Sequence, residues 1–197
     1  MAKNMQPVLK RCRTLGLEPS VMGLDKSSNR TFDQRRKKQS EYGMQLNEKQ
    51  KVRFIYGVLE KQFAKYYVMA TKMNGVTGEC LLSILESRLD NVIYRMGLAN
   101  TRREARQIVN HGHVTVNGKR VDIPSYLVTP GEVISLKESS RNADRMKDII
   151  ERNSSRLVPK WIDMNKDTCE AKILAAADRD DIDYPVEEHM IVEHYSK

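Results

Sequence analysis

The chain has 197 residues, of which 40% are hydrophobic and 30% are charged, a composition typical of a globular protein. No stretch approaches the roughly 20 consecutive apolar residues of a membrane-spanning helix. No apolar core of about 7–15 residues follows Met1, as it would in a signal peptide. These absences exclude a membrane protein and lead us to expect a cytoplasmic one.

The net charge of +8 is unevenly distributed along the chain. Residues 1–160 carry 30 Lys and Arg against 16 Asp and Glu, whereas residues 161–197 carry 4 against 10. A basic body with an acidic end favours a folded protein that binds a polyanion on one face. Charge that serves solubility alone is the alternative.

The first 43 residues form a basic N-terminal segment that we predict to be irregular, because few apolar positions repeat at helical spacing. Asn47, with Gln50 three residues later, is a suitable helix cap. An apolar stripe at helical spacing follows, and the helix should end near Asn74-Gly75. The stripe consists of Val52, Ile55, Leu59, Phe63, Tyr66 and Ala70.

A second apolar series runs from Leu81 to Met96 and should end at Gly97. Thr101 and Glu104 then form a capping box for a short helix that should end at His111-Gly112. Asn117-Gly118 lies between alternating apolar residues and predicts a type I′ hairpin. Residues 132–136 predict a further strand, so residues 88–137 should form helix, helix, hairpin and strand.

The remaining chain predicts a helical stretch over residues 141–156, with Trp161 as a packing anchor and Met190-Ile191-Val192 returning the terminus to the body. We therefore predict an α+β fold with three parts. They are the N-terminal segment 1–43, a helical body 44–87 joined by the tail 157–197, and an inserted RNA-binding module 88–156.

Arg102, Arg103 and Arg106 lie in the first turns of the predicted helix after Thr101, where backbone N–H groups also favour a phosphate. Lys119-Arg120 follows the hairpin turn. Together they predict a phosphate clamp. A solvated charged face is the alternative interpretation.

A second basic track begins at Arg35-Arg36-Lys37-Lys38 and continues through Lys49, Lys51 and Arg53. The first run alone could equally be a targeting patch or a solvated loop. Tyr42, between the two parts, could stack on a base or pack against the helix start.

Patterns typical of enzymes and metal sites are weak in this sequence. Gly112 to Gly118-Lys119 departs from a P-loop because Arg120 replaces the Ser or Thr that binds magnesium. His189 and His194 are five residues apart, which is not the spacing of H-E-x-x-H. Cys12, Cys80 and Cys169 form no C-x-x-C pair, so we expect free thiols. We predict no catalytic residue, no cofactor and no metal.

Several motifs resemble one family closely. Ser87-Arg-Leu-Asp-Asn91, Tyr94-Arg-Met-Gly97, Thr101-Arg-Arg-Glu-Ala-Arg106 and His113-Val-Thr-Val-Asn-Gly-Lys119 are similar to the RNA-binding module named after small-subunit ribosomal protein S4. The flanks, from Arg35-Arg-Lys-Lys-Gln-Ser-Glu-Tyr-Gly43 onward and at Pro159-Lys-Trp161, resemble the ribosomal protein family itself.

The resemblance implies a structural constituent of the small ribosomal subunit. Such a protein would bind the five-prime domain of the rRNA first, nucleate assembly, adjoin ribosomal proteins S5 and S12, contact messenger RNA and influence translational accuracy. It implies rRNA contacts at Arg88, Arg95, Arg102, Arg103, Arg106, His111, Lys119, Arg120, Lys49, Lys51 and Arg53. It implies contacts with incoming messenger RNA at Arg35, Arg36 and Lys38.

Two other functions use the same module. A free RNA-binding regulator of its own operon stays open on the sequence. An RNA-modifying enzyme is disfavoured, because the 37 residues after position 160 are too few for a catalytic domain. The family's zinc-binding members carry four N-terminal cysteines. Here Leu9 and Cys12 stand at the expected pair, which implies the zinc-free form.

Overall fold

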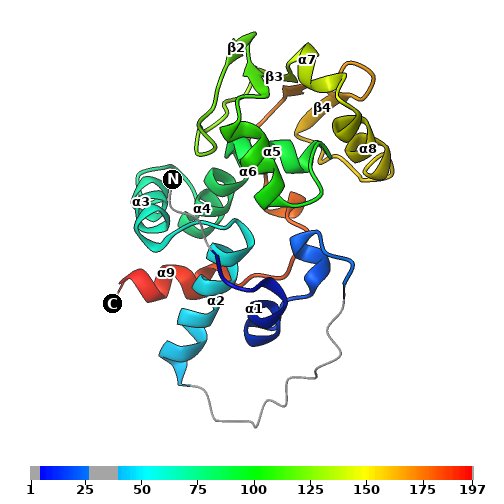
Figure 1. Ribbon diagram of the computed structural model, residues 1–197. Coiled ribbons are helices and arrows are strands. Elements are labelled where there is room, and N and C mark those ends of the chain that lie inside the picture. Colours follow the sequence, from blue (N-terminus) through cyan, green and yellow to red (C-terminus); the bar gives the residue numbers. More distant parts are fainter. Residues whose placement is uncertain (1–4, 27–39, 197) are drawn as a thin grey trace. The chain divides into compact units, whose positions relative to one another are not determined.

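The computed structural model describes residues 5–26 and 40–196 (Figure 1). It divides into two compact units, Met1–Leu82 with Asp183–Lys197, and Ser83–Ile182. The second unit is thus inserted into the first along the chain. The division differs from the predicted one, because residues 157–182 belong with the second unit and not with the helical body.

The first unit begins with α1 (Val8–Leu15) and the 3₁₀ turn η1 (Pro19–Met22). Cys12, Leu15, Leu17 and Met22 are buried. The prediction of an irregular segment is therefore wrong for these residues. A helix of eight residues has little stability of its own and forms here because one side is buried, a contribution that local sequence does not reveal.

Two helices replace the single one predicted after Asn47. The first, α2 (Glu41–Ile55), begins earlier because the Ser40 hydroxyl accepts a hydrogen bond from the Gly43 N–H at 3.2 Å. The helix is then interrupted at Gly57, whose φ of 62° is left-handed, and α3 (Glu60–Ala70) follows. Leu59, predicted to be in the stripe, is the N-cap of α3 and is 41% exposed.

The C-terminal helix α9 (Glu188–Ser196) packs against α2. Ile191 is fully buried, and the Gln45 side chain donates a hydrogen bond to Glu193 at 2.9 Å. The Tyr184 hydroxyl is hydrogen-bonded to that of Tyr56. The predicted return of the terminus to the body is confirmed.

The second unit carries the helices of the predicted module. Helix α4 (Thr77–Glu86) crosses the boundary between the units, and α5 (Leu89–Arg95) and α6 (Arg102–Asn110) follow. The predicted apolar series is split at Arg88, the N-cap of α5. After strand β3 (Val133–Leu136) come α7 (Glu138–Arg141) and α8 (Asp144–Arg152). Helix α8 lies within the predicted helical stretch 141–156, whereas α7 lies mostly before it. The turn η2 (Arg179–Asp181) ends the unit.

An antiparallel sheet of five described strands has the order β2-β1-β3-β5-β4. Its strands are β1 (Val114–Val116), β2 (Lys119–Arg120), β3 (Val133–Leu136), β4 (Ile162–Asn165) and β5 (Glu170–Ile173). Asn117 and Gly118 have φ values of 49° and 77°, which confirms the type I′ turn. Strands β4 and β5, which no sequence pattern predicted, join the sheet through the pairing of β5 with β3.

The core of the second unit lies between the sheet and α5, α6 and α8. Val92, Ile93 and Ile134 are fully buried. Trp161 is 4% exposed and belongs to the same cluster, so its predicted role as a packing anchor is confirmed. The mixture of helices and antiparallel strands confirms the predicted α+β class.

Candidate nucleic-acid interface

Four of the predicted RNA-binding arginines are engaged inside the second unit. Arg88 forms two hydrogen bonds with Asp90, at 3.0 and 2.7 Å, and both side chains are 3% exposed. Arg95 binds Glu86 through two contacts of 2.9 Å. Buried charges of this kind require their partners to remain in the protein. Arg88 and Arg95 therefore contribute to the fold, and the predicted rRNA contacts at these two residues stay predictions.

Arg102 and Arg106 extend this buried network to α6. The Nε of Arg102 donates to Asn91 at 2.8 Å, and its guanidinium lies 4.4 Å from the centre of the Tyr94 ring. Arg106 donates to Asp90 at 2.9 Å. These contacts fix α6 against α5. Arg102 is buried and Arg106 is half-buried, so Arg103 is the exposed member of the predicted clamp, which stays a prediction.

The start of α6 has the predicted Thr101 cap, but the bond to the Glu104 side chain comes from the residue before the cap and so does not complete the predicted capping box. The Thr101 hydroxyl accepts a hydrogen bond from the Glu104 N–H at 3.1 Å, and the Glu104 carboxylate accepts one from the Asn100 N–H at 2.9 Å. Arg103 lies in the first turn and is exposed. It is the member of the predicted clamp that an anion in solution can reach most easily.

At the other end of α6, exposed cations from the hairpin lie beside two histidines. Lys119 and Arg120 are both exposed. A Cβ atom added to Gly112 would come within 2.2 Å of the Arg120 Nε, so this guanidinium covers the backbone of Gly112. His111 is exposed, and its ring centre is 6.0 Å from that of His113. Burial, assisted by the charges of His111, Lys137 and Arg120, lowers the pKa of His113.

The predicted track at residues 49–53 lies in the first unit and is also paired. Lys49 and Arg53 bind the same carboxylate of Glu60, at 2.8 and 2.7 Å, and Lys51 binds Glu48. The Lys49 side chain is 8% exposed. These three residues stabilise the helices around them. Because their charges are already paired within the protein, the predicted rRNA contacts at Lys49, Lys51 and Arg53 are less favoured. The other part of the track, Arg35, Arg36 and Lys38, lies outside the described residues.

Tyr42 is 56% exposed, and its ring centre lies 5.2 Å from that of His194. This contact shows that part of the ring packs on α9. The rest of the Tyr42 ring is exposed, and its stacking on a base stays a prediction.

Neither a metal cluster nor a membrane span is found in the described part of the chain. Among residues 5–26 and 40–196, His, Cys, Asp and Glu side chains form no group of three or more that could hold a metal ion. No helix within those ranges has both the length and the apolar character needed to cross a bilayer. Burial raises the pKa of the Cys12 thiol, which keeps it protonated.

The exposed set Arg103, His111, Lys119 and Arg120 is thus what the second unit retains of the predicted interface. Sequence reasoning missed Lys137 and Arg145, which lie near the same histidines. No motif spacing links them to the histidines, because Lys137 follows β3 and Arg145 lies on α8.

The whole chain matches known proteins from end to end. Residues 3–86 match the family described as ribosomal protein S4/S9 N-terminal domain, and residues 87–134 match the S4 domain. Small ribosomal subunit protein uS4 of Agathobacter rectalis is 57% identical over 197 residues, covering all of both chains. The chain belongs to the uS4 family. Its uS4 relative in Lachnoclostridium phytofermentans is 56% identical over 198 residues, and that in Halothermothrix orenii is 53% identical over 208 residues, each over all of both chains.

Membership in the uS4 family confirms the predicted resemblance. Proteins of the uS4 family are structural and non-enzymatic, so the prediction that the chain is not an enzyme is confirmed as well. The S4 domain match covers α5, α6, the hairpin and the first two residues of β3, which is the part of the second unit that presents the exposed set.

Proposed function

We propose that the chain, as a structural constituent of the small ribosomal subunit, binds rRNA through the exposed set Arg103, His111, Lys119 and Arg120. The observation that carries this assignment is the contrast within the S4 domain. Arg88, Arg95 and Arg102 are buried and Arg106 is half-buried, whereas all four residues of the exposed set are exposed. Cations that stay hydrated in the free protein can exchange water and counterions for phosphates at little cost to the fold.

The buried network supports this function indirectly. It ties α5 to α6 through Asp90 and Asn91, so the cations at both ends of α6 are held on a rigid element. Phosphate contacts that position a protein on RNA need such a rigid element. On a mobile element the backbone would also lose conformational freedom on binding, in addition to each long side chain.

Charge reversal at the surface tests the proposal. The triple variant Arg103→Glu, Lys119→Glu and Arg120→Glu should weaken binding of the full-length protein to a transcript of the rRNA five-prime domain by at least about a hundredfold, because roughly three phosphate contacts are lost. The matched control reverses three exposed cations elsewhere in the same unit, Lys147, Arg152 and Lys160.

Both triple variants change the net charge equally, so they separate a specific surface from general attraction. Equal loss of affinity in the two variants would contradict the proposal and leave a nonspecific polycation. Circular dichroism and thermal unfolding of both variants show whether the fold is intact, which is expected because none of the six residues is buried.

Finer assignments follow from the family resemblance. We propose that the chain acts in cytoplasmic ribosomes, nucleates assembly of the five-prime domain and adjoins ribosomal proteins S5 and S12. We further propose that Arg35, Arg36 and Lys38 contact incoming messenger RNA and influence translational accuracy. Crosslinking in intact ribosomes, followed by identification of the bound nucleotides and proteins, tests these contacts. Absence of the chain from small subunits in a sucrose gradient would favour a free regulator of its own operon instead.

A further inference from the structure

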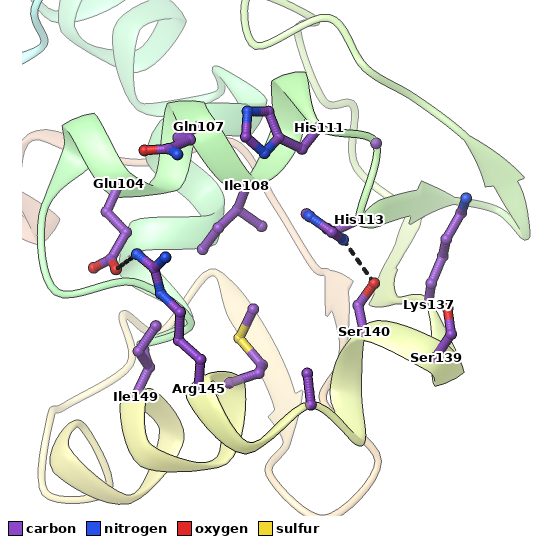
Figure 2. A pocket seen from close by; sticks show the side chains of 13 residues that line it. Glu104, Gln107, Ile108, His111, His113, Lys137, Ser139, Ser140, Arg145 and Ile149 are labelled. Carbon is purple, nitrogen blue, oxygen red and sulfur yellow. Dashed lines mark hydrogen bonds and ion pairs between the residues drawn. The ribbon is translucent and has the colours of Figure 1, made fainter.

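A groove of about 460 Å³ lies within the second unit, between α6 and the α7–α8 segment. Figure 2 shows Glu104, Gln107, Ile108 and His111 along one wall, and Ser139, Ser140, Arg145 and Ile149 along the other. Three of the hydrophobic side chains that line it, Ile108, Met146 and Ile149, are 4–7% exposed. A partly apolar lining with a few polar groups is typical of a site for a small ligand.

The polar groups at the rim are planar or carry hydrogen-bonding atoms. Gln107 and His111 are both exposed. The Nδ1 atom of His113 is hydrogen-bonded to the Ser140 hydroxyl at 2.8 Å, which fixes the ring. The other ring nitrogen of His113 points away from Ser140, toward the side of the groove where Ile108 lies (Figure 2). A flat heterocycle with donors and acceptors along its edges suits these groups better than a purely apolar ligand does.

The charges around the groove favour an anion. Lys137 and Arg145 line it, and Arg120 covers its Gly112 backbone. Of the described residues that line the groove, Glu104 is the one carboxylate. Glu104 binds Arg145 at 3.2 Å, so these two charges offset each other, and Lys137 and the nearby Arg120 supply the remaining positive charge. The occupant should therefore carry negative charge close to a flat ring.

We propose that this groove binds one unpaired nucleotide of the RNA, with the base against Ile108 and His111 and the phosphate near Lys137 and Arg120. Proteins read single-stranded RNA by taking bases out of the stack and placing them against aromatic or histidine side chains. The inference rests on the proposed rRNA binding and adds a base-binding site to it. Lys137, His113 and Ser139 thereby gain a role in recognition.

The first test fills the groove. Ser139 is exposed and lines the groove, whereas Ser155 is exposed in the same unit and does not. The full-length Ser139→Trp variant should bind the five-prime domain transcript at least about tenfold more weakly than Ser155→Trp, because stacking of one base contributes that much or more. Likewise, His111→Ala should weaken binding, whereas His189→Ala, at an exposed histidine of the first unit, should not.

Chemical probing of base edges identifies the nucleotide. In the wild-type complex one unpaired base should be protected, and it should become reactive with Ser139→Trp while the rest of the footprint stays. If the wild type binds specifically but all four variants give its affinity and footprint, the groove is not a base site and the proposed function still stands. If the wild type itself shows no specific binding to the transcript, the proposed function is overturned.

The second test does not depend on rRNA. Adenosine, cytidine, guanosine and uridine monophosphates are titrated into the isotope-labelled full-length protein and followed by nuclear magnetic resonance. At least one should shift the His111, His113 and Ile108 signals more than ribose 5-phosphate does at equal concentration. Equal shifts would mean a phosphate site without base recognition. Shifts caused only by an acidic peptide of equal charge would assign the groove to a protein partner. Either result overturns the proposal.

Discussion

The carboxylate of Asp90 receives two guanidinium groups, from Arg88 at 2.7 Å and from Arg106 at 2.8 Å. It is 3% exposed, so neither arginine could exchange it for water without moving the backbone. A carboxylate in this position connects the start of α5 to the middle of α6. Removal of the Asp90 carboxylate would therefore affect the packing of α5 on α6, and not the exposed residues of the interface directly.

Replacement of Asp90 by Ala should therefore destabilise the protein by about 3–5 kcal/mol, because two buried guanidinium groups lose their counterion. Urea unfolding followed by circular dichroism measures the change. Asp148→Ala, at an exposed position on α8, should alter stability by less than about 0.5 kcal/mol. Similar small effects at both sites would show that the Asp90 pairs contribute little.

Glu60 is a second shared carboxylate, in the first unit. Burial raises its pKa, but hydrogen bonds from Lys49 and Tyr195 and the nearby positive charges outweigh this effect and hold the pKa below the ordinary 4.5. A lowered carboxyl pKa stabilises the folded state above the pKa of the unfolded chain, and this contribution is lost as pH falls through the folded value.

We accordingly expect Glu60→Gln to melt at a lower temperature than the wild type at neutral pH. The difference should shrink as the pH falls below about 4.5, where the unfolded-state carboxyl is protonated, and should vanish once the folded carboxyl is protonated too. Melting curves of both proteins across this range test the sign. A difference that stays constant with pH would mean that Glu60 acts through packing and not through its charge.

At the scale of elements, local chemistry predicted those structures whose hydrogen bonds are local. The cap at Thr101 and the turn at Asn117-Gly118 are both determined by neighbouring residues, and both occur as expected. Strands β4 and β5 were missed, because Ala171 is paired with Ile134 across a segment that contains α7, α8 and β4. The start of α2 was misplaced since Ser40 and Asn47 are both suitable caps and only tertiary packing selects one of them.

Substitutions at two glycines distinguish the effect of backbone strain from that of a side-chain collision. Gly112 and Gly118 have φ values of 71° and 77°, so alanine at either position should cost about 1–2 kcal/mol. Only at Gly112 would the added Cβ collide with the Arg120 guanidinium, whereas nothing lies within 4 Å of the corresponding atom at Gly118.

Gly112→Ala should therefore lower both stability and RNA affinity, because Arg120 must move, while Gly118→Ala should lower stability alone. Parallel unfolding and binding measurements on the two variants distinguish these effects. Equal RNA affinity in the two would show that the position of Arg120 over Gly112 does not matter for binding.

At the scale of the whole molecule, charge distribution and motif order were enough to predict the family, the α+β class and an inserted module. The sites were less predictable, because residue type gives the charge of a side chain but not its burial. Arg95 and Arg103 illustrate this, since one is bound to Glu86 inside the unit and the other is exposed. The difference depends on carboxylates placed by the tertiary fold.

The zinc-free character is a prediction about the whole chain. Cys12 is buried in the first unit, and Cys80 lies beside the carbonyl of Asn74, at 3.6 Å. A single thiol cannot complete a four-ligand zinc site. Incubation with a chelator should leave the melting temperature unchanged, and elemental analysis should find far less than one zinc per chain. Stoichiometric zinc would contradict the prediction.

Salt should act on RNA binding in proportion to the phosphates contacted. If roughly six to ten phosphates are involved, affinity should fall by about three to five decades between roughly 50 and 200 mM monovalent salt, with duplex DNA as the upper guide. Preference for the five-prime domain over a shuffled transcript should persist at each salt concentration, because shape and 2′-hydroxyl contacts are less screened. A shallow dependence would argue against binding through cations, and a steep one without preference would indicate a nonspecific polycation.

The insertion of residues 83–182 into the first unit has a consequence for the order of synthesis. Helix α2 is made early, but α9, which covers it, is made last. During translation the second unit can complete its own core while the first still lacks a segment. The apolar surface of α2 that α9 covers therefore stays exposed, or is shielded by a chaperone, until α9 has been made. A newborn chain of this protein should thus acquire its RNA-binding domain before its helical body is finished.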